Sequence, residues 1–154
     1  KIESKKNILI VSQNVDGLHE EAGSKNLIEL HGNIWETICI KCMDVQKEKS
    51  LHKDIPPDCS LCNGLLRPNV VWFDEIIPAS KIDNISEKIN HCDLFLILGT
   101  SGLVQPASLF GVYAKQKNKY VIEINLDETP NNHFYDLHIM DKVGEVFNSL
   151  NYDF

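Results

Sequence analysis

Four of the five cysteines lie in two Cys-x-x-Cys pairs, Cys39 with Cys42 and Cys59 with Cys62. Each pair places two thiolates on one tight turn, and two such turns complete the tetrahedron that Zn²⁺ prefers. Because four protein ligands leave no open coordination position, we expect a structural zinc. Two redox-active dithiols are the alternative, but neither pair has the strand-to-helix context of a thioredoxin-like motif. The fifth cysteine, Cys92, is expected to pack at a helix end.

Polar residues follow three short apolar runs, where strands of a sheet would end. The first cluster offers three hydrogen-bonding side chains within four positions: Gln13, Asn14 and Asp16. The second, residues 99–102, supplies small residues and backbone N–H groups that suit a phosphate or a ribose. The third contains Asn125, which could bind ribose hydroxyls or cap a turn. Ligands of open α/β sheets bind beyond such strand ends, although ordinary turn chemistry explains the first cluster equally well.

His31 stands directly before Gly32. A histidine beside a glycine could act as a general base that the backbone of a substrate can approach closely. A structural histidine is the alternative. The other histidines compete for a catalytic role with less context around them: His19, His52, His91, His133 and His138.

Buried strands must position these residues. Three short apolar runs, at 7–12, 93–98 and 119–124, are typical of strands in a parallel sheet. Isoleucines recur at helical spacing after Ser80, which could cap that helix, and Pro106 suits the first turn of another. Alternation of strand and helix predicts an open α/β sheet.

Residues 37–69 interrupt this alternation. The segment holds the paired cysteines and two adjacent prolines, with little periodic hydrophobicity. We therefore predict an inserted zinc-binding module at 37–69 and a sheet domain formed by 1–36 and 70–154. A segment this short and polar would draw much of its folding free energy from the metal.

The composition excludes several classes of protein. The chain has 154 residues, 43% hydrophobic and 24% charged, with a net charge of −7. Such a chain is expected to be soluble and globular, and its acidic charge disfavours direct binding of nucleic acid. It contains no apolar run of membrane-spanning length and no signal peptide, so we expect a cytoplasmic protein, with nucleus and mitochondrion left open.

Taken together, six motifs in this order resemble the sirtuin (Sir2) family. They are residues 13–19 (QNVDGLH), His31-Gly32, the two cysteine pairs, residues 67–75 (RPNVVWFDE), Gly99-Thr100-Ser101, and Asn125-Leu126. Residues 66–73 and 99–107 look most like the branch that contains bacterial sirtuins and the mitochondrial desuccinylase.

The resemblance implies a Rossmann-like domain with a small four-cysteine zinc domain, and NAD as cosubstrate. It implies removal of acyl groups, such as acetyl or succinyl and malonyl, from protein lysines, with nicotinamide and O-acyl-ADP-ribose as products. It implies that His31 deprotonates a ribose hydroxyl. The acyl-lysine peptide would lie as a strand against residues 71–75 and 103–105, a form of β-augmentation.

The resemblance also implies a role for each matching residue. Nicotinamide would contact Asn14 and Asp16, with Gln13 at its ribose. The remaining NAD contacts would be Gly99, Thr100, Ser101, Asn125, Leu126, Lys142 and Val143. The substrate contacts would be Val71, Phe73, Asp74, Glu75 and Val104.

Three departures from the family pattern stand out. Sirtuins carry a Gly-Ala-Gly-x-Ser segment before the first motif, and this chain begins after it, so we expect weak activity or none from these residues alone. Asp74 stands where the family usually has glycine, and Ser12 replaces a commoner threonine. The residues that would read the acyl group lie upstream, so acyl preference, protein targets and oligomeric state cannot be predicted.

Two other functions are alternatives to a deacylase. They are a zinc-ribbon module that binds proteins and an ADP-ribosyl transferase that uses the same pocket.

Overall fold

The apolar run near the start of the chain forms a parallel strand pair. In a computed structural model that describes residues 2–47 and 56–150, β1 (Ile10–Ser12) pairs with β2 (Leu27–Glu29). A short helix, α1 (Leu18–Glu21), lies between the two strands in sequence. The predicted strand at 7–12 is therefore shorter than expected. This pair belongs to the first of two compact units, which runs from Glu3 to Lys81.

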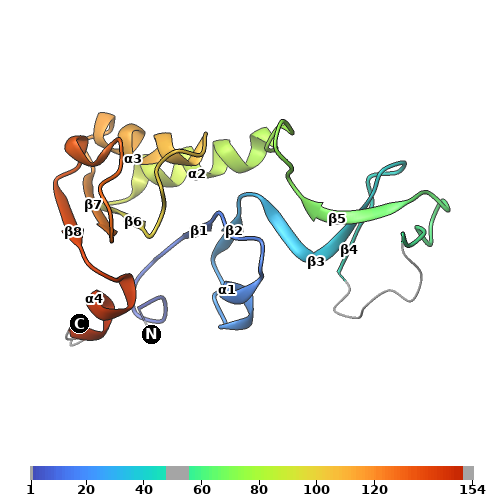
Figure 1. Cartoon of the computed structure of the whole chain (residues 1–154), viewed down its shortest axis with the longest axis horizontal. Coiled ribbons are helices and arrows are strands. Elements are labelled where there is room, and N and C mark those ends of the chain that lie inside the picture. Colours follow the sequence, from blue (N-terminus) through green and yellow to red (C-terminus); the bar gives the residue numbers. More distant parts are fainter. Residues whose placement is uncertain (1, 48–55, 151–154) are drawn as a thin grey trace. The chain divides into compact units, whose positions relative to one another are not determined.

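A three-stranded antiparallel sheet completes the first unit (Figure 1). Its order is β4-β3-β5, with β3 at Gly32–Cys39, β4 at Val45–Lys47 and β5 at Leu66–Val70. The register of β3 and β5 shifts between Asn33 and Thr37, which marks a bulge. The strands β3 and β5 extend this sheet into the segment 37–69, where the sequence predicts the zinc-binding module.

The second unit, from Ile82 onward, contains a parallel sheet of order β6-β7-β8. The predicted strands at 93–98 and 119–124 form β6 (Leu94–Leu98) and β7 (Tyr120–Asn125), and β8 (Leu137–Met140) joins them. The remaining elements are α2 (Ala79–His91), α3 (Ala107–Gln116), a 3-10 turn (Asn132–Phe134) and α4 (Val143–Ser149). The predicted parallel α/β sheet is confirmed.

Close packing of α3 on the sheet sets the core of the second unit. A Cβ at Gly111 would lie 2.6 Å from Ile97 Cδ1 and 2.7 Å from the Tyr135 hydroxyl, so a larger residue there would require these side chains to shift. The helix contacts β6 and β7, as Figure 1 also shows. The buried apolar residues of this unit are Ile85, Ile89, Phe110, Ala114, Val121 and Ile124.

Two sequence predictions need correction or refinement here. Ser80 does not cap α2, because the helix already begins at Ala79. Cys92 is half-buried directly after that helix, and its thiol donates to Ile89 O at 3.4 Å. Within the described residues, no helix combines the length and apolarity that crossing a membrane requires.

The Asp136 carboxylate binds the start of β7, and its contacts make the stability of the fold depend on pH. Its carboxylate pairs with Lys115 Nζ at 2.6 Å and accepts from the Val121 N–H at 2.7 Å. The Lys115 bond, followed by the Val121 N–H, lowers the pKa of Asp136. A carboxyl whose pKa is lower in the folded state stabilises the fold above its unfolded pKa, near 4, and this contribution is lost as the pH falls through the folded value.

We therefore expect Asp136→Asn to lower the free energy of unfolding at pH 7 and to lose that difference progressively below about pH 4. Urea unfolding from pH 3 to pH 7 measures it, with the exposed Asp127 replaced by Asn as the control. If Asp136→Asn lowered the free energy of unfolding equally at pH 3 and pH 7, the stabilising role of the Asp136 carboxylate would be contradicted.

Candidate functional site

The two Cys-x-x-Cys turns are built alike. In each, the N–H of the residue after the second cysteine donates to the first cysteine's carbonyl, and the first cysteine's N–H donates to a carbonyl five residues on. In each, the residue after the second cysteine has a positive φ, 62° at Met43 and 52° at Asn63. The N–H groups of Lys41 and Leu61 point at the Sγ atoms of Cys39 and Cys59. Such paired turns are the knuckles expected of a zinc ribbon.

The four sulfur atoms meet in one cluster. All lie within 4.8 Å of one another, and Cys39 and Cys59 are buried. The backbone N–H groups of Cys42 and then Lys41 lower the pKa of Cys39 to about 6. For Cys42 the Asp44 N–H acts in the same direction, but the neighbouring sulfurs and burial raise its pKa to about 12 overall. Sulfurs this close can all become thiolates only if a cation neutralises them, so the cluster fits the predicted structural Zn²⁺.

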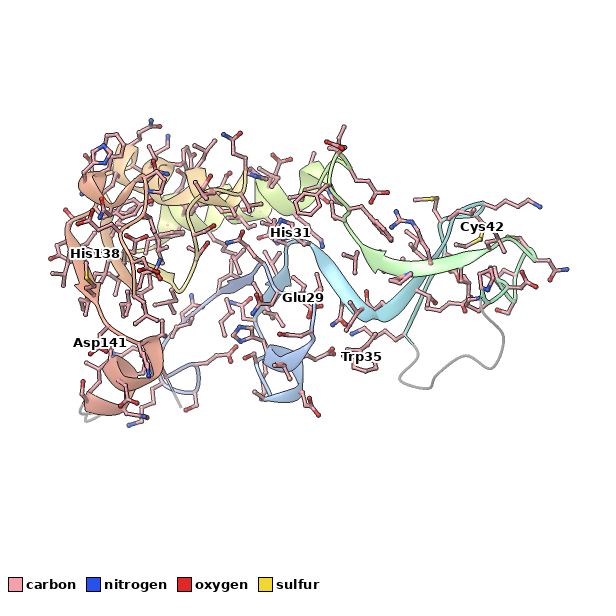
Figure 2. All side chains as sticks on the ribbon, viewed as in Figure 1. Glu29, His31, Trp35, Cys42, His138 and Asp141 are labelled. Atoms are coloured by element: carbon pink, nitrogen blue, oxygen red, sulfur yellow. The ribbon has the colours of Figure 1, made fainter. Side chains whose placement is uncertain are left out.

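His31 lies between β2 and β3, where Figure 2 marks it. Its Nδ1 is 3.1 Å from Gln13 O. Because a carbonyl oxygen can only accept, Nδ1 carries the hydrogen in this bond, and in the neutral ring Nε2 carries the lone pair. The backbone on either side is also held. His31 O accepts from the Val71 N–H at 2.9 Å, and a Cβ on Gly32 would lie 2.0 Å from Asn69 O.

The loop after β1 is held in a turn by its own side chains. Ser12 Oγ accepts from the Asn14 N–H at 3.2 Å, and Asp16 Oδ1 accepts from the Leu18 N–H at 3.0 Å. The turn chemistry that the sequence suggested is therefore real. It coexists with a second feature, because Gln13 O lies against the His31 ring. Within the first unit, the backbone of the predicted polar cluster thus contacts the ring of the predicted base at Gln13 O.

In the second unit, two of the predicted strand ends join. Asn125 Nδ2 donates to Thr100 O at 2.6 Å, which ties the end of β7 to the loop after β6. Thr100 Oγ1 and Ser101 Oγ accept from the N–H groups of Gly102 and Leu103, at 3.5 and 3.4 Å. A cavity of about 260 Å³ opens beside this junction, lined by Gly99, Asn125, Leu126, Asp141, Lys142 and Val143.

Five of these six lining residues are predicted NAD contacts, and Asp141 is the addition. Apolar Leu126 and Val143 offer surfaces for a flat ring, while Asn125 and Asp141 offer hydrogen-bonding groups at the wall. That combination fits an adenosine. Asp141, marked in Figure 2, could have been found from the sequence only by its place directly before Lys142.

The predicted substrate residues fall in two places. Val71 to Glu75 form the loop after β5, where Phe73 is 93% exposed. Glu75 is held by Arg67 at 2.9 Å and accepts from the Trp72 N–H at 3.0 Å. Val104, in the second unit, precedes α3 and accepts from the Ser108 N–H. Val71 is the member of this set that the structure ties directly to the His31 backbone.

Asp74 has a φ of 72°, in the left-handed region that glycine adopts freely. We expect Asp74→Gly to raise the free energy of unfolding by about 0.5–1 kcal/mol, because it removes a strained conformation. Asp74→Ala keeps the strain, loses the polar side chain and should be destabilising. Chemical denaturation of the three chains measures this order. An Asp74→Gly chain less stable than the Asp74→Ala chain would contradict it.

The comparisons with known proteins agree with this geometry. Residues 1–106 match the Sir2 family. The NAD-dependent protein deacylase 1 of Caldanaerobacter subterraneus subsp. tengcongensis is 46% identical over 127 residues, which are 81% of this chain and 52% of the relative. The chain thus spans about half the length of that curated relative.

Solved structures show the same likeness. The crystal structure of a Sir2 homologue in complex with NAD superimposes with a TM-score of 0.86 at 40% identity, over 92% of this chain and 56% of that one. A complex of Sir2 with a p53 peptide and NAD⁺ gives a TM-score of 0.82 at 32% identity, over 92% of this chain and 60% of that one.

Proposed function

We propose that this chain, which belongs to the Sir2 family, supplies the catalytic histidine and the zinc site of an NAD-dependent protein-lysine deacylase. The observation that carries the proposal is the fixed His31 ring, whose Nδ1–H bond to Gln13 O leaves Nε2 as the basic atom. A zinc ribbon that only binds proteins has no need of such a base.

In this proposal, His31 takes a proton from a hydroxyl of the nicotinamide ribose after the acyl oxygen has attacked that ribose. One water molecule is consumed as the amine leaves, so NAD, acyl-lysine and water give nicotinamide, the free lysine and O-acyl-ADP-ribose. A neutral imidazole is a suitable base near neutral pH, because it is largely unprotonated yet still accepts a proton readily. Asn14 and Asp16 flank the nicotinamide, and Gln13 lies at its ribose. The hydrogen bond between the Gln13 carbonyl and the His31 ring supports this arrangement.

The adenosine end of NAD occupies the cavity of the second unit. Asn125 and Leu126 hold the ribose, and Lys142 and Val143 lie at the adenine. Gly99, Thr100 and Ser101 lie along the phosphates and the adjoining ribose. The Asn125 bond to Thr100 O supports this part of the proposal, because it joins the ribose and phosphate segments into one wall.

The acyl-lysine peptide lies along the loop after β5, with Val71 and Phe73 toward the acyl chain and Asp74, Glu75 and Val104 along the peptide. The Val71 N–H bond to His31 O supports this, since it places the loop backbone beside the proposed base. Phe73, almost fully exposed, offers an apolar surface that a bound acyl-lysine would cover.

The division into a Rossmann-like domain of residues 1–36 and 70–154 and a zinc module of 37–69 is part of this proposal. A cytoplasmic location likewise stays a prediction. The acyl group is proposed only as a class, acetyl or succinyl and malonyl.

Product analysis tests the proposed reaction. For this purpose the chain is joined to the part of the Caldanaerobacter relative that it does not match, and this chimera is incubated with NAD and acyl-lysine peptides. Mass spectrometry should find free lysine in the peptide and O-acyl-ADP-ribose in solution. ADP-ribose attached to the peptide would indicate an ADP-ribosyl transferase instead, and unchanged NAD with retained zinc would indicate a protein-binding module.

A further inference from the structure

Three carbonyl groups of the loop after β1 accept hydrogen bonds from one short segment. His31 Nδ1 bonds to Gln13 O at 3.1 Å, the Ile34 N–H bonds to Val15 O at 2.9 Å, and Trp35 Nε1 bonds to Asp16 O at 2.9 Å. The proposed base thus holds one end of the loop, and Trp35 holds the other.

The backbone of Trp35 is itself fixed by a buried amide. Asn33, 1% exposed, accepts from the Trp35 N–H at 2.9 Å through Oδ1 and donates to Glu29 Oε1 at 2.8 Å through Nδ2. Both groups of the amide are therefore satisfied, and the Trp35 position cannot relax without leaving a buried polar group unpaired. Glu29, His31 and Trp35 are marked in Figure 2.

The loop of residues 13–17 also packs against Trp35 and Asn33. Gly17 has a φ of 74°, and a Cβ there would lie 3.0 Å from Trp35 Cδ1 and 3.1 Å from Asn33 Nδ2. The indole ring therefore limits where the loop can move, and its N–H fixes the Asp16 peptide group. Asp16 Oδ1 accepts from the Leu18 N–H, and this bond ties the carboxylate to the loop backbone. The orientation of the Asp16 peptide group therefore also determines the direction of the Asp16 carboxylate.

We infer that Trp35 is a positioning residue: its indole N–H sets the Asp16 peptide group and, with His31, holds the loop of residues 13–17 in place. The inference rests on the proposed function for its meaning, because that loop is the proposed nicotinamide site. Trp35 lies outside the six motifs of the family resemblance, and its contact bridges 19 positions of sequence.

Site-resolved amide exchange on the chain itself tests the inference. Trp35→Phe keeps a ring against Gly17 and removes the N–H donor. We expect the Ile34 and Leu18 amides to exchange about fivefold faster, the change that loss of one ordinary hydrogen bond gives. Amides that pair β3 with β5 should change less than twofold. Trp72→Phe, the matched control, should leave the Ile34 and Leu18 rates as they are.

Two further readouts keep the test decisive. Replacing Trp35 with β-(3-benzothienyl)alanine retains the bicyclic shape without the N–H, and it should reproduce the faster exchange. ¹⁵N NMR of His31 should show hydrogen on Nδ1 in the unaltered chain and a mixture of tautomers in Trp35→Phe. Unchanged Ile34 and Leu18 rates, or an equal rise throughout β3 and β5, would overturn the inference. Because these measurements need no NAD, failure of the proposed reaction would not alter them.

Discussion

Removal of the metal is expected to unfold the β4-β3-β5 sheet while the β6-β7-β8 sheet keeps its amide protection. The reason is the small apolar core around the sulfur cluster, which consists of Cys39, Cys59, Cys62 and Leu66. Zn²⁺ bound by four cysteines contributes roughly 10–16 kcal/mol of apparent free energy, far more than so small a core can supply. Hydrogen exchange before and after dialysis against a strong chelator measures the loss in each sheet.

Cysteine variants give this prediction a matched control. Purified chain should contain one zinc per molecule by atomic emission, Cys59→Ser should lose it, and Cys92→Ser should retain it. Cys92 is half-buried at a helix end and outside the cluster. A Cys59→Ser chain that keeps full protection in β3 and β5 would show that the cluster does not support the fold.

His31→Ala is expected to lower acyl removal by the chimera about 10²- to 10⁴-fold, the range that a general base contributes. The zinc content and the unfolding midpoint should stay close to those of the unaltered chimera, because among the described residues the substitution removes a single ring hydrogen bond, to Gln13 O. Initial rates with saturating NAD and peptide measure the effect.

The control for this prediction is His19→Ala, since His19 is an exposed residue of α1 outside the proposed contacts. It should retain full activity. Equal activity in the His31→Ala chimera would remove His31 from the catalytic machinery and leave the zinc site as the chief functional feature of the first unit.

The sequence predicted the zinc site well because the ligands of each knuckle are three positions apart. Local spacing brings together the two sulfurs of each pair, and the two pairs do gather in one cluster. The strands at 94–98 and 120–125 were also predictable, because their apolar runs are continuous.

Short strands and distant contacts escaped prediction for a physical reason. β2 has three residues, and β8 mixes apolar residues with His138, so neither has a recognisable period. Their positions depend on partners far along the chain. His138, for example, bonds through Nδ1 to the buried Glu123 at 2.9 Å.

The hydrogen bond from Trp35 to Asp16 O likewise joins residues that are far apart in the sequence. Side chains at the strand ends could therefore be named from the sequence, but the groups that hold them could not.

Nicotinamide release from NAD decides whether these residues serve a deacylase. The chimera and the chain alone are each incubated with NAD and acetyl-lysine or succinyl-lysine peptides, and with the same peptides bearing unmodified lysine. We expect the chimera to release one nicotinamide for each acyl group removed, unmodified peptides to give none, and the chain alone to give little. A chimera that holds its zinc and folds, yet releases no nicotinamide with any acyl peptide, would show that His31 and the polar loop do not serve this reaction.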